Sequence, residues 1–225
     1  MVQDLPEEYS VEHYPNAIER GADLWLHVGS IAVACCASFW MVWITLKSGS
    51  ASLAVAALVY GFCLTAMLAL SAVYNLSRIS PTRPLLRRLD EAGIFLMIAG
   101  SYTPFTTQRL HGVWAVGMTI AVWTIAAAGI FGKFAFPHIL ERAWTLVYVL
   151  FGWLAVAAFR PLAASLPHTA LALLIAGGVV YTIGSLIFLN RNLPFRRAIW
   201  HGLVCTAAAL HFMAVVIGVL TPVEA

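Results

Sequence analysis

Residues 52–76 read SLAVAALVYGFCLTAMLALSAVYNL, and this run contains no charged side chain. An α-helix rises about 1.5 Å per residue, so a helix of this length crosses a bilayer core about 30 Å thick. The run is too long, and too uniformly apolar, to be the short alternating strand of a membrane barrel. It therefore predicts a transmembrane helix.

Six further apolar stretches flank this run along the chain. They cover residues 24–46, 92–108, 112–132, 143–160, 168–189 and 198–220. The stretch at 92–108 is the shortest, and it reaches spanning length only if its helix begins earlier, near Leu85 to Leu89. Because helices satisfy their own backbone hydrogen bonds in lipid, we predict an all-α, seven-transmembrane-helix bundle that forms a single domain over residues 1–225.

The composition excludes several other classes of protein. The chain is 61% hydrophobic and only 10% charged, whereas about a quarter of the residues in a soluble domain are charged. Thirteen basic residues and a net charge of +3 are too few for a nucleic-acid surface. The four cysteines lie in apolar runs without a CxxC spacing, which favours packing roles over disulfides or a thiolate zinc site. They are Cys35, Cys36, Cys63 and Cys205.

The distribution of Lys and Arg predicts the orientation of the bundle. If the N-terminus lies inside, the inner segments hold 10 of the 13 basic residues and the outer loops hold only Lys47, Arg109 and Arg160. Basic residues concentrate on the cytoplasmic side of membrane proteins. We therefore expect residues 1–23 to be a cytoplasmic segment. Their acidic character does not match a cleavable signal peptide.

Polar residues occur at the predicted inner ends of the second, third and seventh helices. The topology brings them to one depth, although sequence alone does not decide whether they touch. Two interpretations stay open: a set of separately solvated interfacial groups, or one buried cluster whose members are there for function. These residues are Ser71, Asn75, Asp90, Arg197 and His201.

The stretch at 87–105, RRLDEAGIFLMIAGSYTPF, resembles the third-helix signature of the hemolysin III family. This family is the bacterial branch of the progestin and adipoQ receptor superfamily. Further motifs follow in the family's order, and the resemblance extends from about residue 12 to residue 216. They are Asn16-Ala17-Ile18, Ser71 to Tyr74, Gly152-Trp153, Gly177 to Gly184, Ile199 to His201 and His211-Phe212.

The resemblance implies a zinc site at the cytoplasmic end of the bundle. In the family, the second helix supplies one His, the seventh supplies two His four residues apart, and a third-helix Asp holds the metal-bound water. Zinc bound in this way can activate water, and some relatives are thought to hydrolyse lipid amides such as ceramide. By this resemblance Asp90 and Ser71 are the catalytic positions, and His201 is a metal ligand.

The sequence departs from that pattern where the ligands should be. Asn75 and Arg197 stand at two of the three His positions, and Glu91 and Arg20 replace two other histidines of the family motifs. A guanidinium stays charged and repels a divalent cation. We therefore predict a degenerate site without a cofactor, with bound zinc as the alternative.

A specific hypothesis follows from the two substitutions. Arg197 would pair with Asp90 or Glu91, and Asn75 would hydrogen-bond in the same structural polar cluster. His27, near the inner start of the first helix, remains the histidine that could supply a further metal ligand. His211 would lie about 15 Å deeper than His201 and so could not share its ion.

Three functions compete at this point, and a fourth, a heptahelical receptor-like module, fits the helix count but not the orientation expected of G-protein-coupled receptors. The first is a non-catalytic role in lipid binding or membrane homeostasis, with membrane lipids and a bound fatty acid or acyl chain as partners. The second is a zinc-dependent membrane hydrolase of lipid amides. The third is a cytolytic pore, which the apolar middles of the helices disfavour. The resemblance implies location in a bacterial inner membrane. No nucleic-acid partner is expected, and the oligomeric state stays open.

Overall fold

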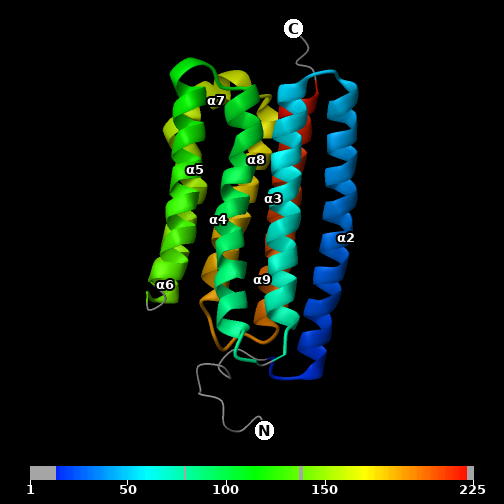
Figure 1. Cartoon of the computed structure of the whole chain (residues 1–225), viewed down its shortest axis with the longest axis vertical. Helices are drawn as coiled ribbons and strands as arrows, with labels where there is room; N and C mark the ends of the chain where they lie inside the picture. The colour runs from blue at the N-terminus through cyan, green and yellow to red at the C-terminus, as the bar shows by residue number, and fades with distance from the viewer. Residues whose placement is uncertain (1–13, 79, 137–138, 222–225) are drawn as a thin grey trace.

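The structure is a computed structural model that describes residues 14–78, 80–136 and 139–221. Within these ranges every regular element is helical, and the long helices run side by side along one axis (Figure 1). In chain order they are α2 (Ala17–Lys47), α3 (Ala51–Leu76), α4 (Arg83–Gln108), α5 (Gly112–Ala135), α6 (Glu141–Gly152), η1 (Trp153–Ala158), α7 (Phe159–Ser165), α8 (His168–Phe188), α9 (Arg196–Val215) and η2 (Val216–Leu220).

Six of these helical segments are long and apolar enough to cross a membrane. They are Ala17–Lys47, Ala51–Leu76, Gly112–Ala135, Glu141–Ser165, His168–Phe188 and Arg196–Leu220. The expectation of an all-helical membrane protein with several spans is confirmed. The span expected at 143–160 runs from α6 through the 3₁₀ segment η1 into α7, so its backbone tightens for about two turns and then returns to the α form.

Helix α4 differs from the other long helices in its composition. It has 26 residues, which is ample length, and it begins at Arg83, earlier than its apolar stretch at 92–108. Its first turns carry Arg87, Arg88, Asp90 and Glu91, which lower its mean hydropathy. Because α4 packs between α3 and α5, these charged groups lie among neighbouring helices.

The surface and the interior have the pattern of a protein in lipid. Large apolar side chains such as Trp25, Phe39 and Val113 are exposed, whereas Asp23 and His201 are buried. Charged and polar groups within a membrane face the bundle interior and find partners there. The interior polar groups are therefore where a functional site is expected.

Close packing between helices depends on small residues. A Cβ added to Gly100 of α4 would lie 2.4 Å from the Cβ of Cys63 on α3, and one added to Gly129 of α5 would lie 2.3 Å from the Phe95 ring. Small residues let helix backbones approach closely in membranes. All four cysteines are free, and Cys63 packs in this contact.

The helix order brings four helix ends together at one end of the bundle. Helices α2, α4 and α9 begin there and α3 ends there, as Figure 1 shows near the N-terminal end of the chain. We call this the polar end. Because α2 also contacts α9, the first and last long helices of the bundle are neighbours at this end.

Candidate functional site: a buried polar cluster

The centre of the site is Asp23, whose side chain is fully buried in the second turn of α2. Its carboxylate accepts a hydrogen bond from the Tyr14 hydroxyl and another from His201 Nδ1, with Nδ1 and Oδ1 separated by 2.5 Å. His27 Nε2 lies 3.5 Å from the other carboxylate oxygen, Oδ2. One carboxylate thus joins the segment before α2, α2 itself and α9.

The start of α2 sets the position of Asp23. The side chain of Asn16 caps the helix by accepting a hydrogen bond from the Glu19 backbone N–H at 2.8 Å, and Glu19 places a negative charge in the first turn, where the helix dipole favours it. With the helix fixed at this point, Asp23 and His27 lie one turn apart on one face. That face turns toward α9.

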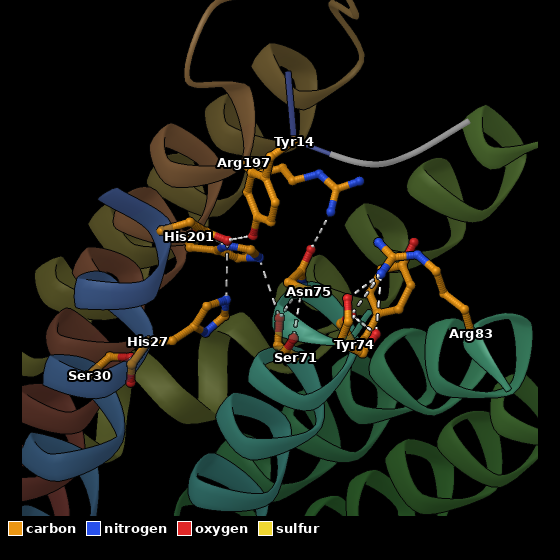
Figure 2. A network of polar contacts seen from close by, with 11 residues as sticks. Tyr14, His27, Ser30, Ser71, Tyr74, Asn75, Arg83, Arg197 and His201 are labelled. Carbon is orange, nitrogen blue, oxygen red and sulfur yellow. Dashed lines mark hydrogen bonds and ion pairs between the residues drawn. The ribbon is translucent and has the colours of Figure 1, made fainter. Parts of the chain in front are cut away.

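His201 extends the cluster from α9 to α3 (Figure 2). Because a carboxylate only accepts hydrogen bonds, Nδ1 of His201 carries the proton that it donates to Asp23. In the neutral ring Nε2 is then an acceptor, and it lies 3.4 Å from the Ser71 hydroxyl oxygen. The rings of His27 and His201 are also in contact, with centroids 4.4 Å apart.

Asn75 and Arg197 close the cluster on the side of α3. The Asn75 amide nitrogen donates to the Ser71 carbonyl at 3.0 Å and lies 3.3 Å from its hydroxyl. Arg197 Nη1 donates to the Asn75 amide oxygen at 3.0 Å. The Arg197 guanidinium also lies over the Tyr14 ring, 5.0 Å from its centroid. The amide therefore uses both ends of its side chain within the cluster.

The structure assigns Arg197 a different partner from the one hypothesised. Within the described ranges no ion pair joins Arg197 to Asp90, and the guanidinium donates to Asn75 instead. Asp90 lines the same cavity as Ser71. Glu91, the other hypothesised partner, pairs with Arg87 at 2.9 Å and with Lys133 at 2.6 Å.

The environment of Tyr14 keeps its hydroxyl protonated. Burial, followed by the hydrogen bond and the charge of Asp23, raises the pKa of Tyr14 well above its ordinary value. An ionised phenol beside a carboxylate would place two negative charges in contact. Tyr14 is therefore a hydrogen-bond donor to Asp23 throughout the physiological pH range.

A cavity of about 390 Å³ borders the cluster. At the polar end its walls include Ser71, Asp90 and His201. Farther in, the walls are mostly apolar and come from α4, α6, η1, α8 and α9, with Ile98 and Leu174 among them. Binding sites for small molecules usually combine apolar walls with a few convergent polar groups. The arrangement suits a molecule with one polar end.

The sequence pointed to several of these residues and missed two. Ser71, Asn75, Arg197 and His201 lie together. Asp23 and Tyr14 are missed because the apolar pattern places residues up to 23 outside the bundle, whereas α2 begins at Ala17. The available signal was the Asp-x-x-x-His spacing of residues 23–27. Residues 1–13 of that segment lie outside the described ranges.

Comparison with known proteins shows what the chain is related to. A family model described as "Haemolysin-III related" matches residues 21–212. The chain belongs to the haemolysin-III family. It is 33% identical over 213 residues to "Hemolysin-3" of Bacillus cereus, covering 95% of this chain and 94% of that protein.

Two further relatives extend the comparison of this haemolysin-III family member. "Hemolysin-3 homolog" of Bacillus subtilis is 29% identical over 204 residues, which is 91% of this chain and 92% of that protein. The human "Monocyte to macrophage differentiation factor" is 29% identical over 170 residues, which is 72% of this chain and 69% of that protein. No solved structure matches the chain significantly.

The residues at the family-type zinc positions do not fit zinc in this family member. Zinc prefers His, Cys and carboxylate ligands. Position 75 holds an amide whose oxygen accepts from Arg197, and position 197 holds that guanidinium. A cation placed between positions 75, 197 and 201 would meet a fixed positive charge. His201 is the one imidazole of that set.

Removing the Tyr14 hydroxyl tests the cluster as a stabilising element. In Tyr14→Phe, Asp23 loses one donor to a buried charge, and hydrogen bonds to charged groups contribute about 1.5–3 kcal/mol. We expect a loss of unfolding free energy in this range, measured by reversible unfolding in mixed micelles. An unchanged unfolding free energy would show that the Tyr14–Asp23 bond does not stabilise the fold.

Proposed function

We propose that this protein is a seven-span membrane protein that binds a fatty acid or a single acyl chain inside the bundle. The polar group of the lipid lies at the polar end, and the chain extends along the apolar walls. The observation that carries the proposal is the cavity of about 390 Å³ that borders Ser71, Asp90 and His201 and continues between apolar side chains. Binding, rather than turnover, is the proposed role.

The basic groups around the cavity support a lipid with an acidic head. Arg197 and Lys133 both line the cavity, and they bring positive charge to its polar end. Lys133 pairs with Glu91, and Arg197 donates to the amide oxygen of Asn75. A guanidinium carries five N–H donors and binds carboxylates with charge-assisted hydrogen bonds. Arg197 is therefore the group proposed to meet the lipid carboxylate.

A second candidate function is hydrolysis of a lipid amide. One observation favours it: Asp90 and Ser71 line the wall of the same cavity. In this function Asp90 would accept a proton from the attacking water. A cytolytic pore is not proposed, because the inner walls of the cavity are mostly apolar and a pore needs polar groups along its length.

The cavity proposal predicts a specific effect of filling the apolar part. Ile98→Trp places a large ring in the cavity wall, whereas Ile120→Trp, at a side chain that is 61% exposed on α5, is the matched control. We expect saturable palmitate binding to weaken by at least about tenfold in Ile98→Trp, the scale of 1.4 kcal/mol, and to be unchanged in Ile120→Trp. Binding is measured with radiolabelled palmitate in mild detergent.

Two other outcomes would contradict lipid binding as the function. Equal palmitate binding by both variants would place the lipid outside the cavity. Release of fatty acid from short-chain ceramide by the wild-type protein, abolished in Asp90→Asn, would instead support the hydrolase. Both measurements use the same protein preparations. The unfolding transition of each variant shows whether that variant is folded.

The proposal includes an N-terminus in the cytoplasm and location in a bacterial plasma membrane. It is supported by the 10 basic residues that fall on the polar side of the bundle, against Lys47, Arg109 and Arg160 on the other. The two Bacillus relatives also fit a bacterial membrane.

Labelling of single cysteines tests this orientation. In a variant whose four native cysteines are replaced, Ser50→Cys lies between α2 and α3, and Ser80→Cys lies between α3 and α4. A membrane-impermeant maleimide added to intact cells should label Ser50→Cys, and should label Ser80→Cys only after permeabilisation. The reverse pattern would invert the topology, and labelling of both in intact cells would contradict the number of spans.

A further inference from the structure

We propose that Asp23, His27 and His201 bind a divalent transition-metal cation of the zinc class. This set draws two ligands from α2 and one from α9, in place of the family-type positions at 75 and 197. The inference does not depend on lipid binding or on hydrolysis, because it concerns the cluster itself.

The spacing of the three side chains suits a cation. One ligand atom from each lies within 4.8 Å of the others, and all three residues are buried. Zinc takes imidazole nitrogen and carboxylate oxygen at about 2.0–2.2 Å in tetrahedral geometry, which puts ligand atoms about 3.5 Å apart. His27 Nε2 and Asp23 Oδ2 already have a separation of 3.5 Å.

The distance between the ligand atoms of His201 and Asp23 has to increase slightly when a metal binds between them. His201 Nδ1 and Asp23 Oδ1 are 2.5 Å apart, the distance of a hydrogen bond. A metal bound at this position replaces the proton on His201 Nδ1, and proton release on metal binding is general for His and carboxylate sites. The Tyr14 hydroxyl would continue to hold the carboxylate from outside, as hydrogen-bond partners of metal ligands commonly do.

A buried ring nitrogen of His27 independently points to a cation. Nε2 of His27 is buried and has no hydrogen-bond partner among the described residues, and His27 itself is only 2% exposed. A buried polar atom without a partner costs free energy. A cation between His27 and Asp23 would accept the lone pair of this nitrogen, which no side chain in the described cluster does.

The charge balance also favours this position over the family-type one. Two neutral imidazoles and the Asp23 carboxylate give the ligand set a negative charge, which three imidazoles would lack. The Arg197 guanidinium contacts the Tyr14 ring and donates to Asn75, and no hydrogen bond or ion pair with His27 or Asp23 is seen among the described residues.

The cavity leaves the site open on one side. His27 and His201 both border the cavity, together with Ser71 and Asp90. Three protein ligands with one open position are typical of zinc sites that bind water or a substrate group. The fourth ligand would therefore enter from the cavity.

Metal stoichiometry tests the site directly. Protein without a polyhistidine tag is stripped with chelator, incubated with zinc, freed of excess metal and analysed by elemental mass spectrometry. We expect about one zinc per chain in the wild type, and at least about tenfold weaker binding in His27→Ala, Asp23→Asn and His201→Ala, since each removes one of three ligands. Cobalt should give the visible absorption of a tetrahedral site in the wild type and not in the three ligand variants.

The controls separate this site from the family-type position and from misfolding. Arg197→Ala and Asn75→Ala should retain zinc, as should His168→Ala, whose histidine is exposed at the start of α8. His27→Gln repeats the key test with a polar side chain in case His27→Ala unfolds. Zinc well below one per chain in the wild type, or full binding in both folded His27 variants, would overturn the proposal.

Discussion

The carboxylate of Asp23 is the constraint on which the polar end of this bundle depends. A buried carboxylate is costly unless it is hydrogen-bonded. Asp23 is fully buried, its carboxylate accepts hydrogen bonds from Tyr14 and His201, and His27 Nε2 lies 3.5 Å from it. Because these partners come from the segment before α2, from α2 and from α9, satisfying one charge also fixes how the first and last long helices meet.

The arrangement at α3 follows from the same contact. With Nδ1 of His201 turned to Asp23, Nε2 faces Ser71, and Ser71 is in turn bonded by Asn75. Arg197 then completes the chain of contacts through the Asn75 oxygen. Two side chains that are unsuitable as zinc ligands thus form a hydrogen-bonded pair, while the acidic and imidazole groups gather on the side of α2.

The helices were largely predictable from the sequence, because apolar runs of spanning length have few alternatives in lipid. The first turns of helix α4 could not be predicted in this way, because they are charged. Packing between α3 and α5 explains why they are helical within the bundle. The meeting of positions 71, 75, 197 and 201 could be anticipated, since a topology of spans sets the depth of each residue.

The partners within the site could not be predicted in the same way. Charge alone matches Arg197 to Asp90, but the position of Arg197 over Tyr14 directs its guanidinium to Asn75. Asp23 precedes the apolar run at 24–46 and so resembles part of a polar segment. Its spacing from His27 is visible in the sequence, whereas its contact with His201, 178 positions away, is a product of tertiary packing.

A double-mutant cycle between Asp23 and His201 tests the central claim most directly. Unfolding free energies of Asp23→Asn, His201→Gln and the double variant are compared with the wild type in chelator-treated mixed micelles. If the carboxylate joins α2 to α9, the two substitutions should be coupled by about 1.5–3 kcal/mol. Additive effects, within about 0.5 kcal/mol, would contradict the account.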